Sequence, residues 1–288
     1  MNEDLVLFYN LIMSGVLTGC FYALIGMSFV LIYKTSKVLN LCQGELTLLG
    51  GYVCFSIITL TGIPFLAALG LTLFSLFFLG MLIERTILRP LLGESPIAIL
   101  MVTIGLANIL GGIAGMIWGA DTKVFPSIFS SASIVWVSIL VCITLVVGFL
   151  IFFKFSILGI SMRSVASNQQ AALSLGISVK KTLALAWGLS TVLSATAGIF
   201  LGNINGLNLN IKIYGLKALA PVILGGLDSI GGAVLGGFLV GIFEMLGDGY
   251  LSDWIGGSVR DLVAFLIILL VLIIRPHGIF GIKEIERI

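Results

Sequence analysis

Few side chains in the apolar segments of this 288-residue sequence could do chemistry. Burying Glu45 costs the most free energy of them, because a carboxylate inside a membrane segment must be neutral, hydrogen-bonded or close to water. It could contact a solute or orient a helix at a gate. Alternatively, it could lie in the first turn of a helix, where the helix dipole favours a negative charge. Gln43, two residues earlier, is open to both interpretations, and the other acidic candidates are Glu244 and Asp228.

Isolated hydroxyl and amide groups form a second candidate set in two later apolar segments. Such groups usually bond their own backbone or a neighbouring helix, and the alternative is that they line a solute path. Thr103 and Asn108 therefore join Gln43 and Glu45 as candidates for a translocation path. The remaining members of the set are Ser190, Thr191, Ser194 and Thr196.

The sequence offers no recognisable catalytic or metal-binding set. It has one histidine, His277, no recurring pair of carboxylates at helical spacing, no HExxH pattern and no nucleotide-binding glycine loop. We therefore predict that the chain is not an enzyme and holds no metal or cofactor of its own. Its four widely spaced cysteines match no zinc or redox motif and are expected to be small buried hydrophobes. They are Cys20, Cys42, Cys54 and Cys142.

The composition predicts a membrane protein. Hydrophobic residues make up 59% and charged residues 10% of the chain, whereas a soluble domain carries roughly 25% charged residues. The apolar runs do not alternate and approach the roughly 20 residues that a membrane-spanning helix needs, which favours helices over a β-barrel. We expect one all-α transmembrane domain over residues 1–288. The acidic start of the chain predicts that no signal peptide is cleaved.

About eight spans are expected. Residues 216–246 form an apolar segment that is interrupted by glycines and Asp228, with halves too short for a full crossing. This segment is therefore predicted to be either two short spans or a re-entrant hairpin. The other spans are predicted at Leu5–Tyr33, Leu39–Leu60, Phe65–Ile83, Ile97–Trp118, Ile134–Phe153, Thr182–Gly202 and Leu262–Ile274.

The basic residues predict the orientation, because cytoplasmic loops carry an excess of Lys and Arg. The bias places the N-terminus outside and the C-terminus in the cytoplasm of a multi-pass protein of the bacterial inner membrane. Lys123, Lys212, Lys217 and Arg260 then fall outside. The cytoplasmic set is Lys34, Lys37, Arg85, Arg89, Lys154, Arg163, Lys180, Lys181, Arg275, Lys283 and Arg287.

The longest internal stretch that cannot lie in hydrocarbon runs from Met162 to Ile177. Its alanines and leucines favour helix, Ser167 could cap a turn beginning at Asn168, and Gly176 suits a helix C-cap. We predict a short helix outside the membrane, whose small side chains let another surface come close. Composition alone leaves open that it is an ordinary cytoplasmic loop.

Twelve of the 36 glycines of the sequence stand in adjacent pairs. Glycine allows helix backbones to pack closely, and it also allows helices to break where backbone lines a cavity. Both interpretations stay open for the regions around residues 43–51 and 225–232. The candidate gate or broken-helix glycines are Gly50, Gly51, Gly225, Gly226 and Gly232.

Five motifs in order make the chain resemble the permease subunits of bacterial ABC importers for branched-chain amino acids, specifically the shorter of the two paired permeases. Two positions depart from the usual pattern: Asp228 replaces a small residue, and Cys42 stands where Ala is common. The motifs are Asn40–Glu45 with Leu48–Tyr52, Glu84-Arg85 with Arg89–Leu91, Arg163–Ile177, Gly215–Ala218 with Leu224–Leu227 and Gly232–Gly237, and Arg275-Pro276 with Gly278 and Phe280-Gly281.

The resemblance implies that residues 162–177 form the coupling helix that docks into an ATPase subunit. It also implies alternating access driven by two ATP-binding subunits that hold ATP and Mg²⁺. A second homologous permease, or a second copy of this chain, and an extracytoplasmic solute-binding protein are the other implied partners. That protein would deliver solute near Asn203–Asn210 and Asp248–Gly257. The implied coupling residues are Arg163, Ala166, Asn168, Ala171, Ala172, Leu175 and Gly176.

Other functions remain as alternatives at this stage. Within the same superfamily the solute could be urea, a short amide or a sugar. A stand-alone channel or facilitator would need no ATPase partner, and a membrane-embedded enzyme is disfavoured because paired catalytic groups are missing.

Overall fold

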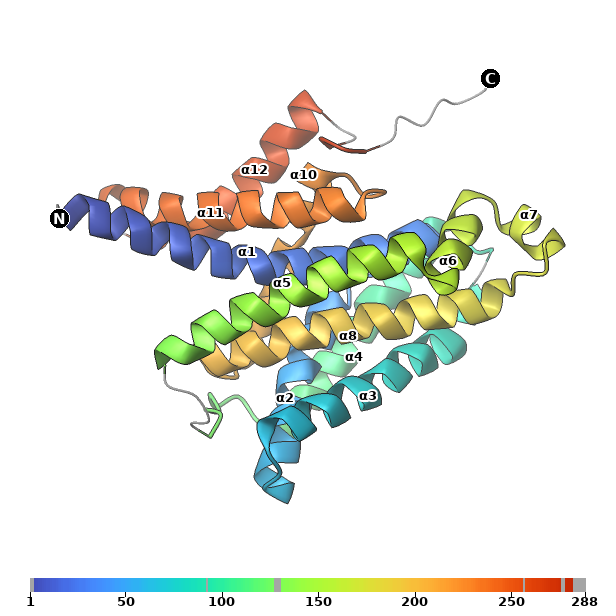
Figure 1. Cartoon of the computed structure of the whole chain (residues 1–288), viewed down its shortest axis with the longest axis horizontal. Coiled ribbons are helices and arrows are strands. Elements are labelled where there is room, and N and C mark those ends of the chain that lie inside the picture. Colours follow the sequence, from blue (N-terminus) through green and yellow to red (C-terminus); the bar gives the residue numbers. More distant parts are fainter. Residues whose placement is uncertain (1–2, 92, 127–130, 256, 276–277, 282–288) are drawn as a thin grey trace.

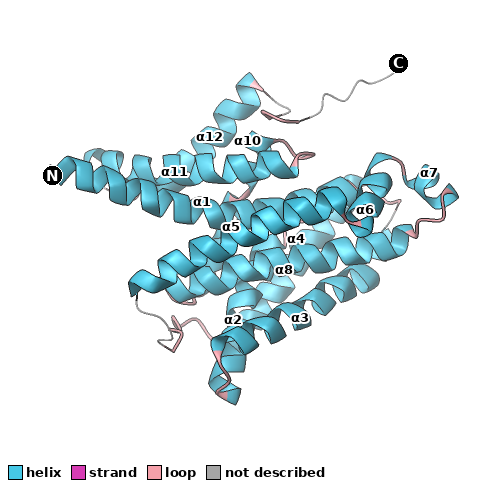
Figure 2. Ribbon diagram, viewed as in Figure 1, coloured by secondary structure: helices cyan, strands magenta, loops and turns pink. Residues whose placement is uncertain are grey.

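The computed structural model describes residues 3–91, 93–126, 131–255, 257–275 and 278–281. Within these ranges the chain is built of helices joined by short connections (Figure 2). The prediction of an all-α, polytopic bundle is therefore confirmed. Pro276, His277, Lys283 and Arg287 lie outside the described residues.

Seven helices in the described ranges are long and apolar enough to cross a membrane. A further apolar helix, α12 (Arg260–Ile274), has 15 residues, fewer than the roughly 20 of a typical span. Together they account for the predicted count of about eight. The seven are α1 (Glu3–Ser36), α2 (Gln43–Thr61), α3 (Phe65–Ile83), α4 (Pro96–Trp118), α5 (Ser131–Phe155), α8 (Val179–Asn205) and α11 (Ile230–Ile255).

Shorter helices connect the long ones. The largest group follows α8, where the chain makes three short helices before α11 begins. The short helices are η1 (Glu84–Leu88, a π-helix), η2 (Arg89–Leu91), α6 (Ile157–Ser167), α7 (Gln169–Ser174), η3 (Leu209–Ile211), α9 (Lys212–Lys217) and α10 (Leu219–Gly225).

Helices α1 and α8 form the centre of the bundle, and α3, α4 and α5 form part of its periphery. In the most apolar window, 83% of α1 and of α8 is buried, against 28% of α3 and of α4. Helix α11 lies antiparallel along α1 (Figure 1). A Cβ added at Gly15 would lie 2.7 Å from the Cα of Ile242, and one at Gly19 would lie 2.8 Å from the Cα of Phe238. Glycine is therefore required where these two helices meet.

The segment 216–246 breaks where the sequence predicts, but the half after the break is longer than expected. The chain turns at Gly226, whose φ of 99° suits glycine, and α11 then continues for 26 residues to Ile255. The predicted segment ended at residue 246, before Asp248. In the structure Asp248 lies within α11 and accepts a 2.6 Å bond from Arg260.

Helix α2 begins inside the protein rather than at its surface. It starts at Gln43, four residues after the predicted start, because residues 37–42 form an irregular connection in which Asn40 accepts a bond from the Cys42 N–H at 3.2 Å. Gln43 contacts Ser190 and Ser194, which lie in the middle of α8. The N-terminal end of α2 is therefore near the middle of the bundle.

Candidate functional site

The predicted coupling stretch folds as the second half of α6 followed by α7, where α5 ends and α8 begins, and α7 projects beyond both long helices (Figure 1). Ser167 was expected to cap the second helix, but it is the last residue of α6. Asn168 is the cap instead, and its side chain accepts from the Ala171 N–H at 3.0 Å. Gly176 ends α7 with a φ of 81°, and the Ile177 N–H donates to Ala172 at 3.0 Å. This is the hydrogen-bonding pattern of a glycine-terminated helix.

Side chains tie this segment to the helices on either side of it. Arg163 donates to the carbonyl oxygen of Lys154 at 3.0 Å and also to that of Phe153, at the C-terminal end of α5. Val165 and Ala172 are buried against Val179 and Leu183 at the start of α8. A displacement of α6 and α7 would therefore move α5 and α8 with them.

The outer side of the segment is a groove of about 370 Å³. Five of the predicted coupling residues line it, and Ala166 and Gly176 are not among its lining residues. Leu175 is 78% exposed, so the groove has an uncovered apolar rim. The lining residues are Ile160, Arg163, Ser164, Ser167, Asn168, Ala171, Ala172 and Leu175.

Gln43 is fully buried, and its polar atoms have partners on two other helices. Its side-chain oxygen accepts from Asn40 at 2.8 Å, and its amide nitrogen contacts Ser28 of α1 at 2.7 Å and Ser190 of α8 at 3.1 Å. Ser194 is a further partner. Gln43 therefore joins α1, α2 and α8 from within.

The four candidates for a translocation path do not meet at one place. Thr103 is buried like Gln43, accepting from the Leu41 N–H at 3.3 Å and donating to its own helix. Glu45 is half-buried and Asn108 is exposed, on the side where α4 packs beside the start of α2. Of the four, only Glu45 and Asn108 could meet a solute without rearrangement.

The candidate glycines fall into two groups. Gly50 and Gly51 lie within an uninterrupted α2, where the backbone of α8 at Ala195 and Gly198 leaves no room for a Cβ. The other three lie at the turn between α10 and α11, where Gly225 and Gly232 pack against each other. A role for either group in gating stays a prediction.

An ion-pair network that sequence analysis did not assemble links four helices. Glu244 of α11 accepts from Lys217 of α9 at 2.9 Å and from the hydroxyl of Tyr22 of α1 at 2.6 Å. Lys217 also pairs with Asp261 of α12. The bias of the basic residues placed Lys217 on the outer side of the membrane. In the structure its side chain is buried, and carboxylates from two other helices compensate its charge. The isolated Glu244 was the one sequence signal for this network.

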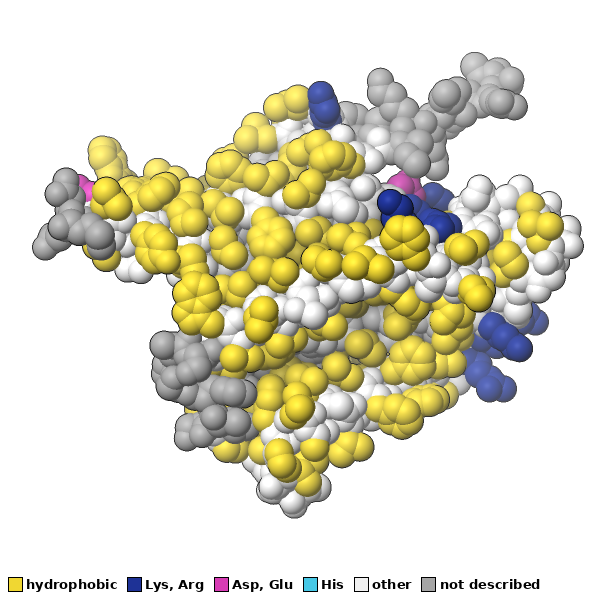
Figure 3. Space-filling model, viewed as in Figure 1, with side chains coloured by type: hydrophobic (Ala, Val, Ile, Leu, Met, Phe, Trp, Pro, Cys, Tyr) yellow, Lys and Arg dark blue, Asp and Glu magenta, His cyan; other side chains and the backbone are white. Residues whose placement is uncertain are grey.

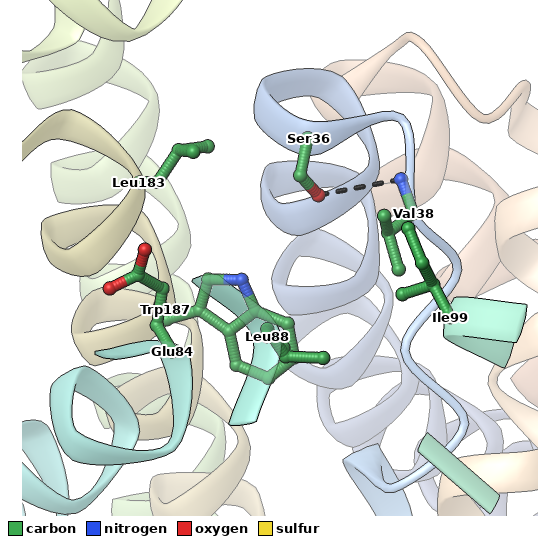
Figure 4. Close-up of a pocket in the computed structure, with 7 residues that line it drawn as sticks. All are labelled: Ser36, Val38, Glu84, Leu88, Ile99, Leu183 and Trp187. Atoms are coloured by element: carbon green, nitrogen blue, oxygen red, sulfur yellow. Dashed lines mark hydrogen bonds between the residues drawn. The ribbon is translucent and has the colours of Figure 1, made fainter. Parts of the chain in front are cut away.

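A small pocket lies between the end of α1, the π-helix and the starts of α4 and α8 (Figure 4). Its volume is about 20 Å³, enough for one water molecule and too small for an organic solute. Glu84 lines it from the π-helix and also pairs with Arg89 at 2.7 Å. This pocket is therefore not a solute site.

On the face shown in Figure 3, most of the Lys and Arg side chains gather at the end from which α6 and α7 project. Long apolar helices, a basic end and a pair of short helices at that end define a multi-pass helical membrane protein. The sequence profile of the branched-chain amino acid transport system permease component matches residues 11–272. The chain belongs to this family.

Curated relatives are similar in sequence to this chain over all or nearly all of its length. The high-affinity branched-chain amino acid transport permease LivH of Escherichia coli is 31% identical, with 100% of each chain covered. BraD of Pseudomonas aeruginosa is 31% identical over 96% of this chain and 97% of its own. A probable LivH of Methanocaldococcus jannaschii is 28% identical over 100% of this chain and 96% of its own.

One solved structure has the same overall fold. PsaBC from Streptococcus pneumoniae, in complex with Fab, aligns with a TM-score of 0.52 at 16% identity. The alignment covers 93% of this chain and 92% of that chain. At this identity the likeness concerns the fold alone.

Proposed function

We propose that this chain is the permease subunit of an ABC importer and carries branched-chain or related apolar amino acids by alternating access. Its family and the names of its relatives support this assignment. The N-terminus is outside and the C-terminus in the cytoplasm, which agrees with the basic residues at the α6–α7 end.

The observation that carries the proposal is the groove on α6 and α7. It is open, apolar at its rim and attached to both α5 and α8. A partner seated there can transmit its own movement to two long helices at once. Two ATP-binding subunits, which hold ATP and Mg²⁺, are the partners that drive transport. A second permease, identical or homologous, and an extracytoplasmic solute-binding protein complete the assembly.

Ala171→Arg in the assembled transporter tests the proposal. Ala171 is exposed and lines the groove, so a large charged side chain blocks docking without disturbing the interior. Ala172 is unsuitable because it is buried against α8. Uptake of leucine into proteoliposomes and ATP hydrolysis stimulated by the binding protein should both be lost, while solute binding by the separate binding protein is unchanged.

The matched control is Thr86→Arg, an exposed position on the π-helix outside the groove. It should transport like the wild type. Unchanged uptake in Ala171→Arg would contradict coupling through α6 and α7. A purified chain that moves leucine without ATPase subunits would identify a facilitator instead.

A further inference from the structure

Two residues of opposite charge lie at the middle depth of the bundle without forming an ion pair with each other. Glu45 is in the first turn of α2, which starts beside the middle of α8. Lys212 is the first residue of α9, and its carbonyl oxygen packs against Gly44. Glu45 is half-buried and Lys212 exposed.

The two charged groups face the same point on α4. A Cβ added at Gly111 would lie 3.8 Å from the Lys212 Nζ and 4.0 Å from a Glu45 carboxylate oxygen. Among the described residues, neither charge has an ion-pair partner within 4.0 Å. Lys217, on the same short helix, contrasts with this because two carboxylates neutralise it.

Charges at membrane depth that form no direct ion pair require water, protein or a charged ligand around them, since lipid does not stabilise them. The adjoining surface of α4 is exposed, and a Cβ at Gly105 or at Gly112 would meet no other atom within 4 Å. Asn108, between these two glycines in the sequence, is exposed as well. This side of α4 therefore combines two charges, one amide and an exposed surface of small residues.

We propose that Glu45 and Lys212 form a binding site for the zwitterionic backbone of an amino acid, Glu45 accepting from its ammonium group and Lys212 donating to its carboxylate. This inference rests on the proposed function and adds the residues that recognise the solute inside the membrane. An α-amino acid carries its two charges on adjacent groups, so one molecule can touch both side chains over Gly111. Its aliphatic side chain then lies along the exposed glycine surface of α4.

Urea and neutral amides lack this pair of charges and would leave both protein charges unpaired. A carboxylic acid without an amino group would satisfy Lys212 but not Glu45. The site therefore selects for zwitterions. Contacts with the apolar residues around the site discriminate among amino acids with different aliphatic side chains.

The first experiment uses Lys212→Cys in the full transporter with its ATPase subunits and binding protein. We expect leucine uptake to fall about 10- to 100-fold, the loss of one charge-assisted hydrogen bond. Reaction with 2-aminoethyl methanethiosulfonate places an ammonium group on residue 212 and should restore uptake, whereas the sulfonatoethyl reagent should not. The four native cysteines are all buried, and the wild type treated with each reagent is the control.

Uptake by Lys212→Cys at the wild-type level, or failure of the ammonium reagent to restore lost uptake, would overturn the site. The second experiment compares Glu45→Gln, Lys212→Gln and the double variant. If both residues touch substrate, the double variant is at least as impaired as either single variant. If they serve only to balance each other's charge, the double variant recovers, which also overturns the site.

Glu94→Gln and Lys123→Gln, which neutralise single charges elsewhere, should transport like the wild type. The two proposals fail in different ways. A wild-type transporter that takes up no amino acid overturns the proposed function, whereas an active wild type with equally active variants at residues 45 and 212 overturns the site alone.

Discussion

Two polar regions join helices inside the bundle, one through neutral side chains and the other through charged side chains. Around Gln43, neutral amide and hydroxyl groups join α1, α2 and α8. Around Glu244, formal charges join α1, α9, α11 and α12. Burying a neutral group costs little once it is hydrogen-bonded, whereas a buried charge costs several kcal/mol unless it is paired.

The difference matches the helices that each region holds. The neutral cluster lies between α1 and α8, the most buried helices, where packing already fixes the geometry. The charged network secures α9, a helix of 6 residues, with α12, which is exposed along much of its length. Ion pairs therefore hold these helices in position where few apolar contacts do so. Because α9 also carries Lys212, the network positions the proposed amino acid site.

The largest effect is expected on breaking the charged network. Lys217→Met leaves Glu244 buried at 1% exposure with only the Tyr22 hydroxyl as partner. Removing one partner of a buried pair costs about 3–5 kcal/mol. Thermal unfolding of the purified chain in detergent should show a clear fall in Tm. The double variant Lys217→Met with Glu244→Gln should recover part of this loss, and equal Tm values for single and double variants would contradict the network.

A smaller effect is expected in the neutral cluster. Gln43→Leu keeps a similar volume but leaves Ser28, Ser190 and Asn40 without their amide partner. Unsatisfied buried polar groups cost about 1–3 kcal/mol, so the fall in Tm should be below that of Lys217→Met. Gln170→Leu, an exposed amide on α7, is the control and should unfold like the wild type. A larger fall for Gln43→Leu than for Lys217→Met would reverse the comparison.

The sequence predicted the fold from the length of its apolar runs, and the outer limits of the long helices agree within a few residues except at the end of α11, which lies beyond the predicted end at residue 246. It could not predict that Gln43 starts a helix at mid-depth, because hydropathy does not distinguish an interior start from a surface one. It placed Lys217 and Lys212 on the outer side of the membrane and did not predict that Lys217 is buried. Partners more than 25 residues away in the sequence decide that Lys217 is buried, and such pairing is invisible in a single sequence.

The candidate site was predictable only in part. Arg163, Asn168 and Ala171, which the family resemblance implied as coupling residues, line one groove. Glu45 could be singled out as a costly carboxylate, but its neighbour Lys212 comes from a distant segment whose path depends on the turn after α8. Asn108 is exposed and Thr103 buried although both are lone polar residues in α4, because helix rotation decides which of them faces outward.

The smallest effect is expected at the ion pair between Asp248 and Arg260, which resembles the Glu244 network in chemistry but not in burial. Its N···O distance is 2.6 Å, and the Arg260 side chain is 45% exposed. Exposed pairs contribute about 0–1 kcal/mol because water already stabilises both charges. Arg260→Gln should therefore change Tm far less than Lys217→Met, and added salt should reduce its effect further. A loss as large as that of Lys217→Met would mean that burial is not what separates the two ion pairs.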